Sequence, residues 1–375
     1  MNDAPVGQHR LSDRQRLAWL RLIRTDNVGP QTFRDLINRF GSAEAALEAL
    51  PELASRGRAG AAIRIWPAEA AEAELETAAR FGARFVAIGE ADYPPLLRRV
   101  AGPPPLIAVK GNAAVLRLPA VSIVGARNAS LAGIKMARTL AHELGREGYA
   151  VVSGLARGID AAAHTGSIDT GTVAALAGGL DRPYPPENLS LCADIAERGA
   201  LISEMPFGWE PRARDFPRRN RLIAGLSLGL VVVEAAVRSG SLISARLAGE
   251  AGRLVFAVPG SPLDPRAAGT NGLLKEGAIL VTGVRDIVEA LAPLSNLPPA
   301  APDTFEEPPD FSAAPAPQDD DRARIVECLG PTPVGVDEII RHTGLHPAQV
   351  FMVLLELDLA GRLERHSGGA VSLVD

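Results

Sequence analysis

The segment Ala150-Val151-Val152-Ser153-Gly154-Leu155-Ala156-Arg157-Gly158-Ile159-Asp160 decides the fold of this chain. Its first four residues are a short apolar run, which predicts a buried strand, and the residues after Gly158 follow helical spacing. A glycine-rich turn joins the two. Such a strand, turn and helix form one unit of a parallel sheet that is covered on both faces.

Similar units lie on both sides of this segment. Short apolar runs predict six more strands, at Ala120–Val124, Val173–Ala177, Leu201–Ser203, Leu230–Val233, Leu254–Val258 and Ile279–Val281. Helical spacing predicts helices between them or after the last, at Ala132–Arg146, Asp160–Ile168, Arg219–Leu226, Ser241–Ala251 and Ile287–Leu291. This alternation predicts an α/β fold, a Rossmann-like doubly wound, mostly parallel sheet, with its ligand site beyond the carboxyl ends of the strands.

Four segments follow from the change of pattern along the chain. Residues 1–84 predict an N-terminal helical domain of the SAM or helix-hairpin-helix kind, and residues 85–292 the Rossmann-like domain. Residues 293–321 hold eight prolines, seven acidic residues and no basic ones, which predicts an extended linker. Residues 322–375 have the order of helices and hairpin that is typical of a winged helix.

Composition narrows the class of protein. The chain has 375 residues, enough for two or three domains, and a net charge of −5, which argues against binding duplex DNA or anionic membrane through overall charge. Two cysteines without metal-ligand spacing give no sign of a disulfide framework or a metal site. The first residues lack the apolar core of a signal peptide, so we expect a cytoplasmic protein without a membrane span.

Glycine-rich loops follow several of the predicted strands. They lie at Gly125, at Ser153–Gly158, at Gly178–Gly179, at Ser239-Gly240-Ser241 and at Gly260. Glycine lets backbone N–H groups approach a phosphate closely, and a following helix adds its positive N-terminal end. One such loop is weak evidence because tight turns also need glycine. Five on one predicted edge favour a ligand that carries phosphate.

The densest positive charge lies at residues 212–221, which hold five arginines and one acidic residue. In an acidic chain this cluster is the clearest candidate for binding nucleic acid. The alternative is an ion-pair network with Glu204 and Glu234. Three neighbouring aromatic residues either stack on bases or anchor a long loop: Phe207, Trp209 and Phe216.

Asp160 and His164 lie one helical turn apart, directly after the glycine-rich loop. This spacing suits an acid–base pair, but it equally suits a structural pair that holds the loop at the start of the helix. Neither a nucleophile elbow nor a further metal ligand accompanies them. We therefore favour the structural role and expect no catalytic residue, no metal and no cofactor.

Eight segments together resemble the DNA-processing protein A (DprA, or Smf) family across residues 85–292. They read SIVGAR, VVSGLARGIDAAAH, ALAGGLDRPYPPEN, LISEMPFG, FPRRNRLIAGLS, VVVEAAVRSGSLISARLA, VFAVPG and GTNGLLKEGA. The N-terminal helices and the winged helix also resemble appendages of that family. Before Gly133 the chain has Leu131-Ala132 where the family often has an aromatic residue.

The resemblance implies a non-enzymatic, homodimeric protein that binds single-stranded DNA and loads a RecA-type recombinase during natural transformation, with single-strand-binding protein as a further partner. The positions that it implies for contact with DNA are Gly125, Arg127, Ser153, Gly154, Arg157, Gly158, Arg219, Asn220, Arg221, Ser239, Gly240 and Ser241.

Two enzymatic alternatives fit the residues less well. A nicotinamide dehydrogenase requires G-x-G-x-x-G after the first strand, and Gly125-Ala126-Arg127 breaks that pattern. The central domain also resembles the lysine-decarboxylase-like phosphoribohydrolases, which act on nucleotides. Of their P-G-G-x-G-T-x-x-E motif only fragments are present, at Pro259-Gly260 and Gly269-Thr270. This nucleotide hydrolase stays as the alternative.

The predicted recognition helix of the winged helix, residues 347–358, has two acidic residues and no basic one. Those charges do not suit the major groove of DNA. We therefore expect this domain to contact protein, and the remaining candidates for DNA contact are Arg362, Arg365 and His366 on the wing.

Overall fold

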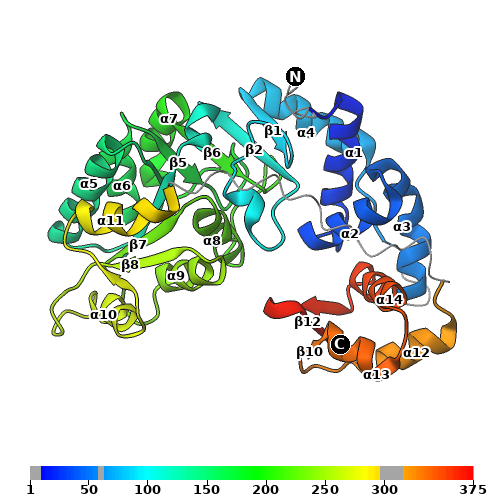
Figure 1. Ribbon diagram of the computed structural model, residues 1–375. Coiled ribbons are helices and arrows are strands. Elements are labelled where there is room, and N and C mark those ends of the chain that lie inside the picture. The colour runs from blue at the N-terminus through cyan, green and yellow to red at the C-terminus, as the bar shows by residue number, and fades with distance from the viewer. Residues whose placement is uncertain (1–9, 58–62, 296–315, 375) are drawn as a thin grey trace, which may run out of the picture. The chain divides into compact units, whose positions relative to one another are not determined.

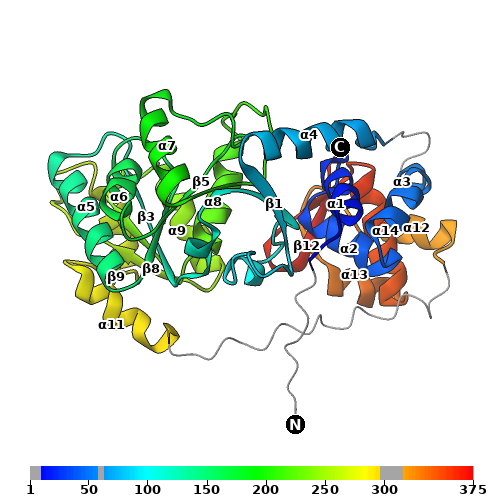
Figure 2. The same ribbon diagram turned by 90° about the horizontal axis from the view of Figure 1, so that it is seen from above.

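The computed structural model describes residues 10–57, 63–295 and 316–374, which divide into two compact units. We call Ala73–Pro298 the sheet unit, and Leu11–Glu72 together with Pro299–Asp375 the helix-wing unit, so far as these ranges are described. Most of the predicted linker, residues 296–315, lies outside the described residues. The two units are drawn in Figures 1 and 2.

The sheet unit is built on nine strands. They are β1 (Ala83–Ala87), β2 (Leu106–Gly111), β3 (Ala120–Gly125), β4 (Ala150–Ser153), β5 (Thr172–Ala175), β6 (Ala200–Ser203), β7 (Gly229–Val233), β8 (Leu254–Ala257) and β9 (Ile279–Leu280). Their order is β1-β2-β6-β5-β4-β3-β7-β8-β9, and all the strands except β1 and β2 run parallel to one another. The predicted doubly wound, mostly parallel sheet is therefore confirmed, and all seven predicted strands are present.

Helices cover both faces of this sheet (Figure 1). The helices of the sheet unit are α5 (Leu131–Arg146), α6 (Ile159–Ser167), α7 (Leu189–Arg198), α8 (Asp215–Gly225), α9 (Gly240–Glu250), α10 (Ala268–Lys275) and α11 (Val284–Ser295), and α4 (Ala68–Arg80) spans the boundary between the two units in the sequence. One apolar core joins α5, α6 and α11 to the sheet, and a second joins α8 and α9 to the opposite face. Buried β-branched residues alternate between the two cores; Val121 belongs to one and Val124 to the other.

Two strands were not predicted, β1 and β2. They pair antiparallel with each other, and β2 pairs antiparallel with β6, so they extend the parallel sheet at one edge. The chain between them is rich in proline and carries a short 3₁₀ helix, Leu97–Arg99. No local sequence pattern predicts these two strands, because the pairing of β2 with β6 joins residues about ninety positions apart.

The helix-wing unit consists of helices and a small sheet. The helices are α1 (Asp13–Arg24), α2 (Pro30–Phe40), α3 (Ala43–Gly57), α12 (Asp319–Glu327), α13 (Val336–Thr343) and α14 (Pro347–Leu359). The sheet has the order β10 (Val334–Gly335), β12 (Ala370–Leu373) and β11 (Leu363–Arg365). Helix α14 lies beside α2 and α3 (Figure 2), and its Met352, Leu355 and Leu359 complete their apolar core. The predicted winged helix is confirmed.

Candidate functional site

The carboxyl ends of β3 and β7 meet at the centre of the sheet, where the strand order reverses. In doubly wound sheets such a reversal opens the crevice that binds ligands. The two strand ends approach closely: a Cβ on Gly125, the last residue of β3, would lie 1.9 Å from the carbonyl oxygen of Val233. Only glycine fits there, so the predicted loop at Gly125 is shaped by packing as well as by any ligand.

The loop after β4 is held from below by Asp160 and His164. The amides of Gly154 and Ala156 donate to Asp160 Oδ2 at 3.1 and 3.4 Å, and the amide of Leu155 donates to His164 Nε2 at 3.3 Å. Leu155 has a left-handed backbone, with φ of +59°. Three successive amides of this loop are therefore engaged within the chain, which is what the structural role of the Asp160–His164 pair predicts.

Burial shifts the pKa of both members of this pair. Burial, together with the smaller effect of the charge of Arg219, lowers the pKa of His164 to about 3. The ring is thus uncharged; it accepts from Leu155 through Nε2, and its Nδ1 lies 2.7 Å from Thr172 Oγ1. Burial also raises the pKa of Asp160, against the opposing effect of Arg219. Neither group has the exposure that proton transfer to a substrate requires.

Arg219 lies beneath the same loop and is 5% exposed. Its Nη1 donates to the carbonyl oxygen of Ala175 at 3.3 Å, and a Cβ on Gly154 would lie 1.5 Å from that nitrogen. Its Nε has no hydrogen-bond partner among the described residues. Burial lowers the pKa of Arg219 to about 10, which leaves the guanidinium charged.

The other two members of the predicted R-N-R motif point elsewhere. Asn220 is buried, and its Nδ2 lies 3.4 Å from the carbonyl oxygen of Gly240. Arg221 pairs with Glu204 at 2.7 Å and also donates to the carbonyl oxygen of Gly102. Since Arg218 pairs with Glu204 as well, at 3.0 Å, the predicted ion-pair network exists for these two arginines.

Glu234 serves the chain in another way. Its backbone is left-handed, with φ of +56°, and its carboxylate accepts the amide of Ser130 at 2.9 Å and the hydroxyl of the same residue. Ser130 is the N-cap of α5, so a carboxylate of the chain sits at the positive end of that helix. At the N-terminus of α9, the Ser239 hydroxyl accepts the amide of Ser241 at 3.3 Å.

The aromatic residues of this region anchor the loop. Phe207 lies edge-on to Phe81 and Phe85, and Trp209 Nε1 donates to Asp215 Oδ2 at 2.9 Å. Phe216 lies 5.4 Å from the guanidinium carbon of Arg127, measured to the ring centre. The geometry favours the anchoring alternative for all three predicted aromatic residues, because each is already in contact with side chains of the chain.

Four exposed arginines lie in the loops after β3 and β4 and before α8. Arg212 lies 4.7 Å from the centre of the Trp209 ring, and we call the other three, Arg127, Arg157 and Arg214, the arginine rim. Arg127 and Arg214 form no ion pair with any described residue, and Arg157 has only an exposed pair with Glu187 at 3.4 Å. Gly158 packs against the backbone of Arg127, which brings the loops of Arg127 and Arg157 together. The rim presents guanidinium groups that suit phosphate.

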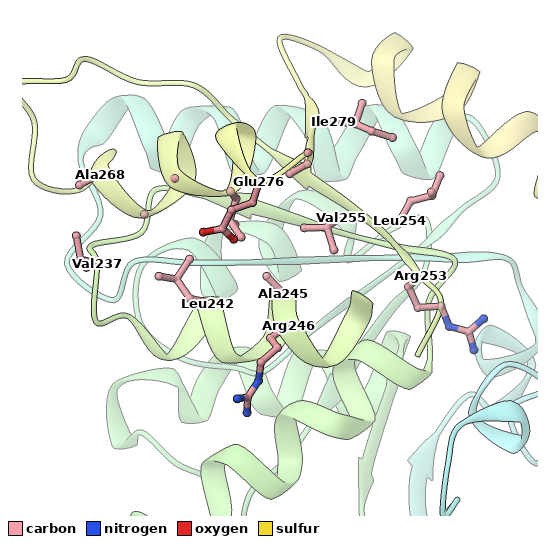
Figure 3. A pocket seen from close by; sticks show the side chains of 15 residues that line it. Val237, Leu242, Ala245, Arg246, Arg253, Leu254, Val255, Ala268, Glu276 and Ile279 are labelled. Atoms are coloured by element: carbon pink, nitrogen blue, oxygen red, sulfur yellow. The ribbon is translucent and has the colours of Figure 1, made fainter. Parts of the chain in front are cut away.

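A cavity of about 750 Å³ opens between α9, β8 and α10, away from the rim (Figure 3). Leu242, Ala245 and Val255 form its apolar wall. Figure 3 shows Arg246 and Arg253 directed away from that wall and the Glu276 carboxylate lying between α9 and α10. An apolar cavity with an inward carboxylate does not suit a phosphate-bearing ligand.

In the helix-wing unit the predicted DNA contacts are engaged within the chain. His366 Nε2 lies 2.8 Å from Ser372 Oγ. On the wing, Arg362 donates to the carbonyl oxygen of Gly57 at 3.1 Å, and Arg365 pairs with Asp35 and Asp358. Helix α14 is almost wholly buried. The unit therefore uses these groups for its own packing, and the protein contact of the winged helix stays a prediction.

No helix among the described residues has both the length and the apolar character needed to cross a bilayer. The described residues also hold no group of three or more His, Cys, Asp or Glu side chains that could bind a metal ion.

Three family models match the chain. The model described as DNA recombination-mediator protein A matches residues 84–292, the DprA-like N-terminal HHH domain matches residues 13–77, and the DprA winged helix domain matches residues 307–369. The chain is 39% identical over 286 residues to Protein Smf of Escherichia coli, covering 75% of each chain.

Two solved structures are similar to the chain. DNA processing protein A of Streptococcus pneumoniae has 39% identity and a TM-score of 0.55, over 58% of this chain and 76% of that one. DNA processing protein A of Helicobacter pylori has 29% identity and a TM-score of 0.52, over 56% of this chain and 96% of that one. The latter structure is described in terms of that protein's binding of single-stranded DNA.

Proposed function

Because the chain belongs to the DNA recombination-mediator protein A family, we propose that it binds single-stranded DNA through the arginine rim and acts as a recombination mediator without catalysis of its own. The observation that carries this proposal is the unpaired, exposed Arg127 beside the loop of Arg157, at the reversal point of the sheet. Single strands suit such a rim because their backbone bends to follow it.

The arrangement of carboxylates also supports this function over the nucleotide hydrolase. Asp160 takes the amides of Gly154 and Ala156, and Glu234 takes that of Ser130, so part of the backbone that a nucleotide phosphate would use is already engaged. Phosphates of a strand meet the guanidinium groups above these loops instead. Of the positions that the resemblance implies, the proposal assigns phosphate contact to Arg127 and Arg157. The others lie in or beside the loops around these two arginines: Gly125, Ser153, Gly154, Gly158, Arg219, Asn220, Arg221, Ser239, Gly240 and Ser241.

The wider role rests on the family. In this proposal the protein works as a cytoplasmic homodimer, meets single-strand-binding protein on the strand and passes the strand to a RecA-type recombinase during natural transformation. The helix-wing unit, whose charged groups are engaged internally, is left for contact with protein.

Fluorescence anisotropy of the full chain with a labelled oligothymidylate, over a series of salt concentrations, tests the proposal. We expect tight binding that weakens with salt, and weaker binding of a duplex at the same salt. Each phosphate contact adds about −0.7 to the log–log slope for single strands. Arg127→Ala and Arg157→Ala should each lower affinity several-fold and reduce the slope by about that amount.

Arg285→Ala is the matched control, because Arg285 is an exposed arginine on α11, paired with Glu289. It should bind as the wild type does. A wild-type protein that fails to bind single strands, or that binds duplex equally well, would contradict the function. Wild-type binding that neither rim variant changes would contradict the site alone.

A further inference from the structure

Resting on this proposed function, we infer that Arg219 is a positioning residue for single-stranded DNA. It fixes the conformation of the loop that carries Arg157 by packing against the buried side of that loop. Its place in the F-P-x-R-N-R motif suggests a phosphate contact. Its place in the structure is different, since the side chain is almost fully buried under Gly154.

The first step of the argument is shape. The guanidinium fills the space directly over the Cα of Gly154, where a Cβ would lie 1.5 Å from Nη1 and 2.5 Å from Cζ. The same nitrogen donates to the carbonyl oxygen of Ala175 at the end of β5. Arg219 is thus fixed between β5 and the loop after β4, and the path of the loop follows the outline of its guanidinium.

The second step is charge. Asp160 lies on the same side of Gly154, with Oδ2 2.9 Å from the position of that Cβ, and it accepts the amides of Gly154 and Ala156. The guanidinium of Arg219 favours the ionised form of this carboxylate. An ionised carboxylate is the stronger acceptor for two amides. The chain of contacts therefore runs from Arg219 to Asp160, to the amides of residues 154 and 156, and on to Arg157.

The third step is the cost that the fold accepts. Arg219 Nε is buried without a hydrogen-bond partner among the described residues, and Leu155 holds a left-handed backbone that side chains disfavour. A hydrophobic residue would fill the same space without the unpaired N–H group. Both features lie at the same loop, and the exposed Arg157 is two positions after Leu155. This fits a loop that is shaped for binding.

A double-mutant cycle in the full chain, read by the anisotropy assay, tests the inference. If Arg219 acts through the loop, Arg219→Gln should lower affinity several-fold in the wild type, by no more than Arg157→Ala does, and by less than twofold once Arg157 is alanine. If Arg219 touches phosphate itself, the two effects add. The inference is wrong if the two effects add, which includes the case in which Arg157→Ala alone does not change the affinity. It is also wrong if the Arg219→Gln protein binds DNA as tightly as the wild type does.

Two further variants keep the result clear. Arg218→Gln is the matched control, because Arg218 is the exposed neighbour that pairs with Glu204, and its effect should add to that of Arg157→Ala. Arg219→Lys keeps the buried charge if Arg219→Gln does not fold, and should show the same non-additivity at smaller size. Hydrogen exchange at the amides of residues 154–156 should quicken in both Arg219 variants; unchanged exchange would also overturn the inference, whether or not DNA binds.

Discussion

Arginine does different work in the two units. In the helix-wing unit, Arg322 meets the buried Glu356 through two hydrogen bonds of 2.8 and 2.9 Å, and Arg365 meets Asp35 and Asp358. Arg322 and Glu356 are 34 positions apart and Arg365 and Asp35 are 330 apart, whereas Arg365 and Asp358 are separated by only seven. At the rim of the sheet unit, Arg127 and Arg214 meet no carboxylate of the described residues.

The difference shows that the carboxylates, and not the number of arginines, decide which arginine is available to a ligand. An arginine that pairs with a buried carboxylate holds two segments of the chain together, because both groups have lost their hydration and each depends on the other for compensation. An exposed arginine without such a partner keeps its charge for an incoming phosphate. On this basis we propose that the rim is the surface that meets DNA, whereas these paired arginines of the winged helix stabilise their own unit.

The variant Arg322→Ala gives the strongest test of this difference between the two units. It leaves the Glu356 carboxylate, which is 1% exposed, without its bidentate partner, and Arg56 at 4.0 Å replaces it only in part. We expect the helix-wing unit to lose about 3 kcal/mol of stability, the usual cost of breaking a buried pair. Hydrogen exchange in α14 should quicken while exchange in β4 stays as in the wild type.

The double variant Arg322→Met with Glu356→Leu should recover much of that loss, because it removes both charges together. An Arg322→Ala protein whose α14 keeps wild-type protection would show that the pair does not stabilise the unit. Loss of protection in both units alike would show that the two units do not differ as proposed.

The sequence predicted the central sheet well because each of its strands is a local apolar run bounded by turn residues. It also predicted the Asp160–His164 pair, since one helical turn separates the two residues and places both under the loop. The resemblance to the family, based on motifs in the same loops, is confirmed by the comparisons.

What the sequence could not predict depends on contacts between distant segments. The five arginines of residues 212–221 look alike in sequence, yet Glu204 engages Arg218 and Arg221 while Arg219 turns inward under Gly154. The role of Glu234 at the N-terminus of α5 joins positions 130 and 234 and has no local pattern. Strands β1 and β2 were missed for the same reason, because their place in the sheet is fixed by pairing with β6.

A change of pH sharpens the comparison in the sheet unit. The pKa of His164 is about 3 in the folded chain, below its ordinary value of about 6.5, so as pH falls the unfolded chain takes up the proton first. Stability should therefore fall from about pH 6.5 downward, by at most about 1.4 kcal/mol per pH unit. The raised pKa of Asp160 acts in the opposite sense above its ordinary value, so the contribution of His164 is best isolated by comparing the wild type with a variant that lacks this ring.

His164→Gln should flatten this dependence, measured as the free energy of unfolding of the sheet unit by denaturant titration at each pH. His142 is exposed on α5, so His142→Gln is the control and should keep the wild-type slope. An equal slope in the His164→Gln and wild-type proteins would mean that another group carries the pH dependence.

The smallest expected effect concerns the one rim arginine that has a carboxylate nearby. Glu187 lies 3.4 Å from Arg157, and both side chains are more than half exposed, so the pair is weak and competes with a phosphate for the same guanidinium. Glu187→Gln should raise the affinity for single-stranded DNA by roughly twofold to fivefold, in keeping with the small energy of exposed pairs. Glu289→Gln removes the same charge from the exposed pair with Arg285 on α11 and should leave affinity unchanged. An equal gain in both variants would assign the effect to net charge, whereas a gain confined to Glu187→Gln places a phosphate at Arg157, where the carboxylate had been.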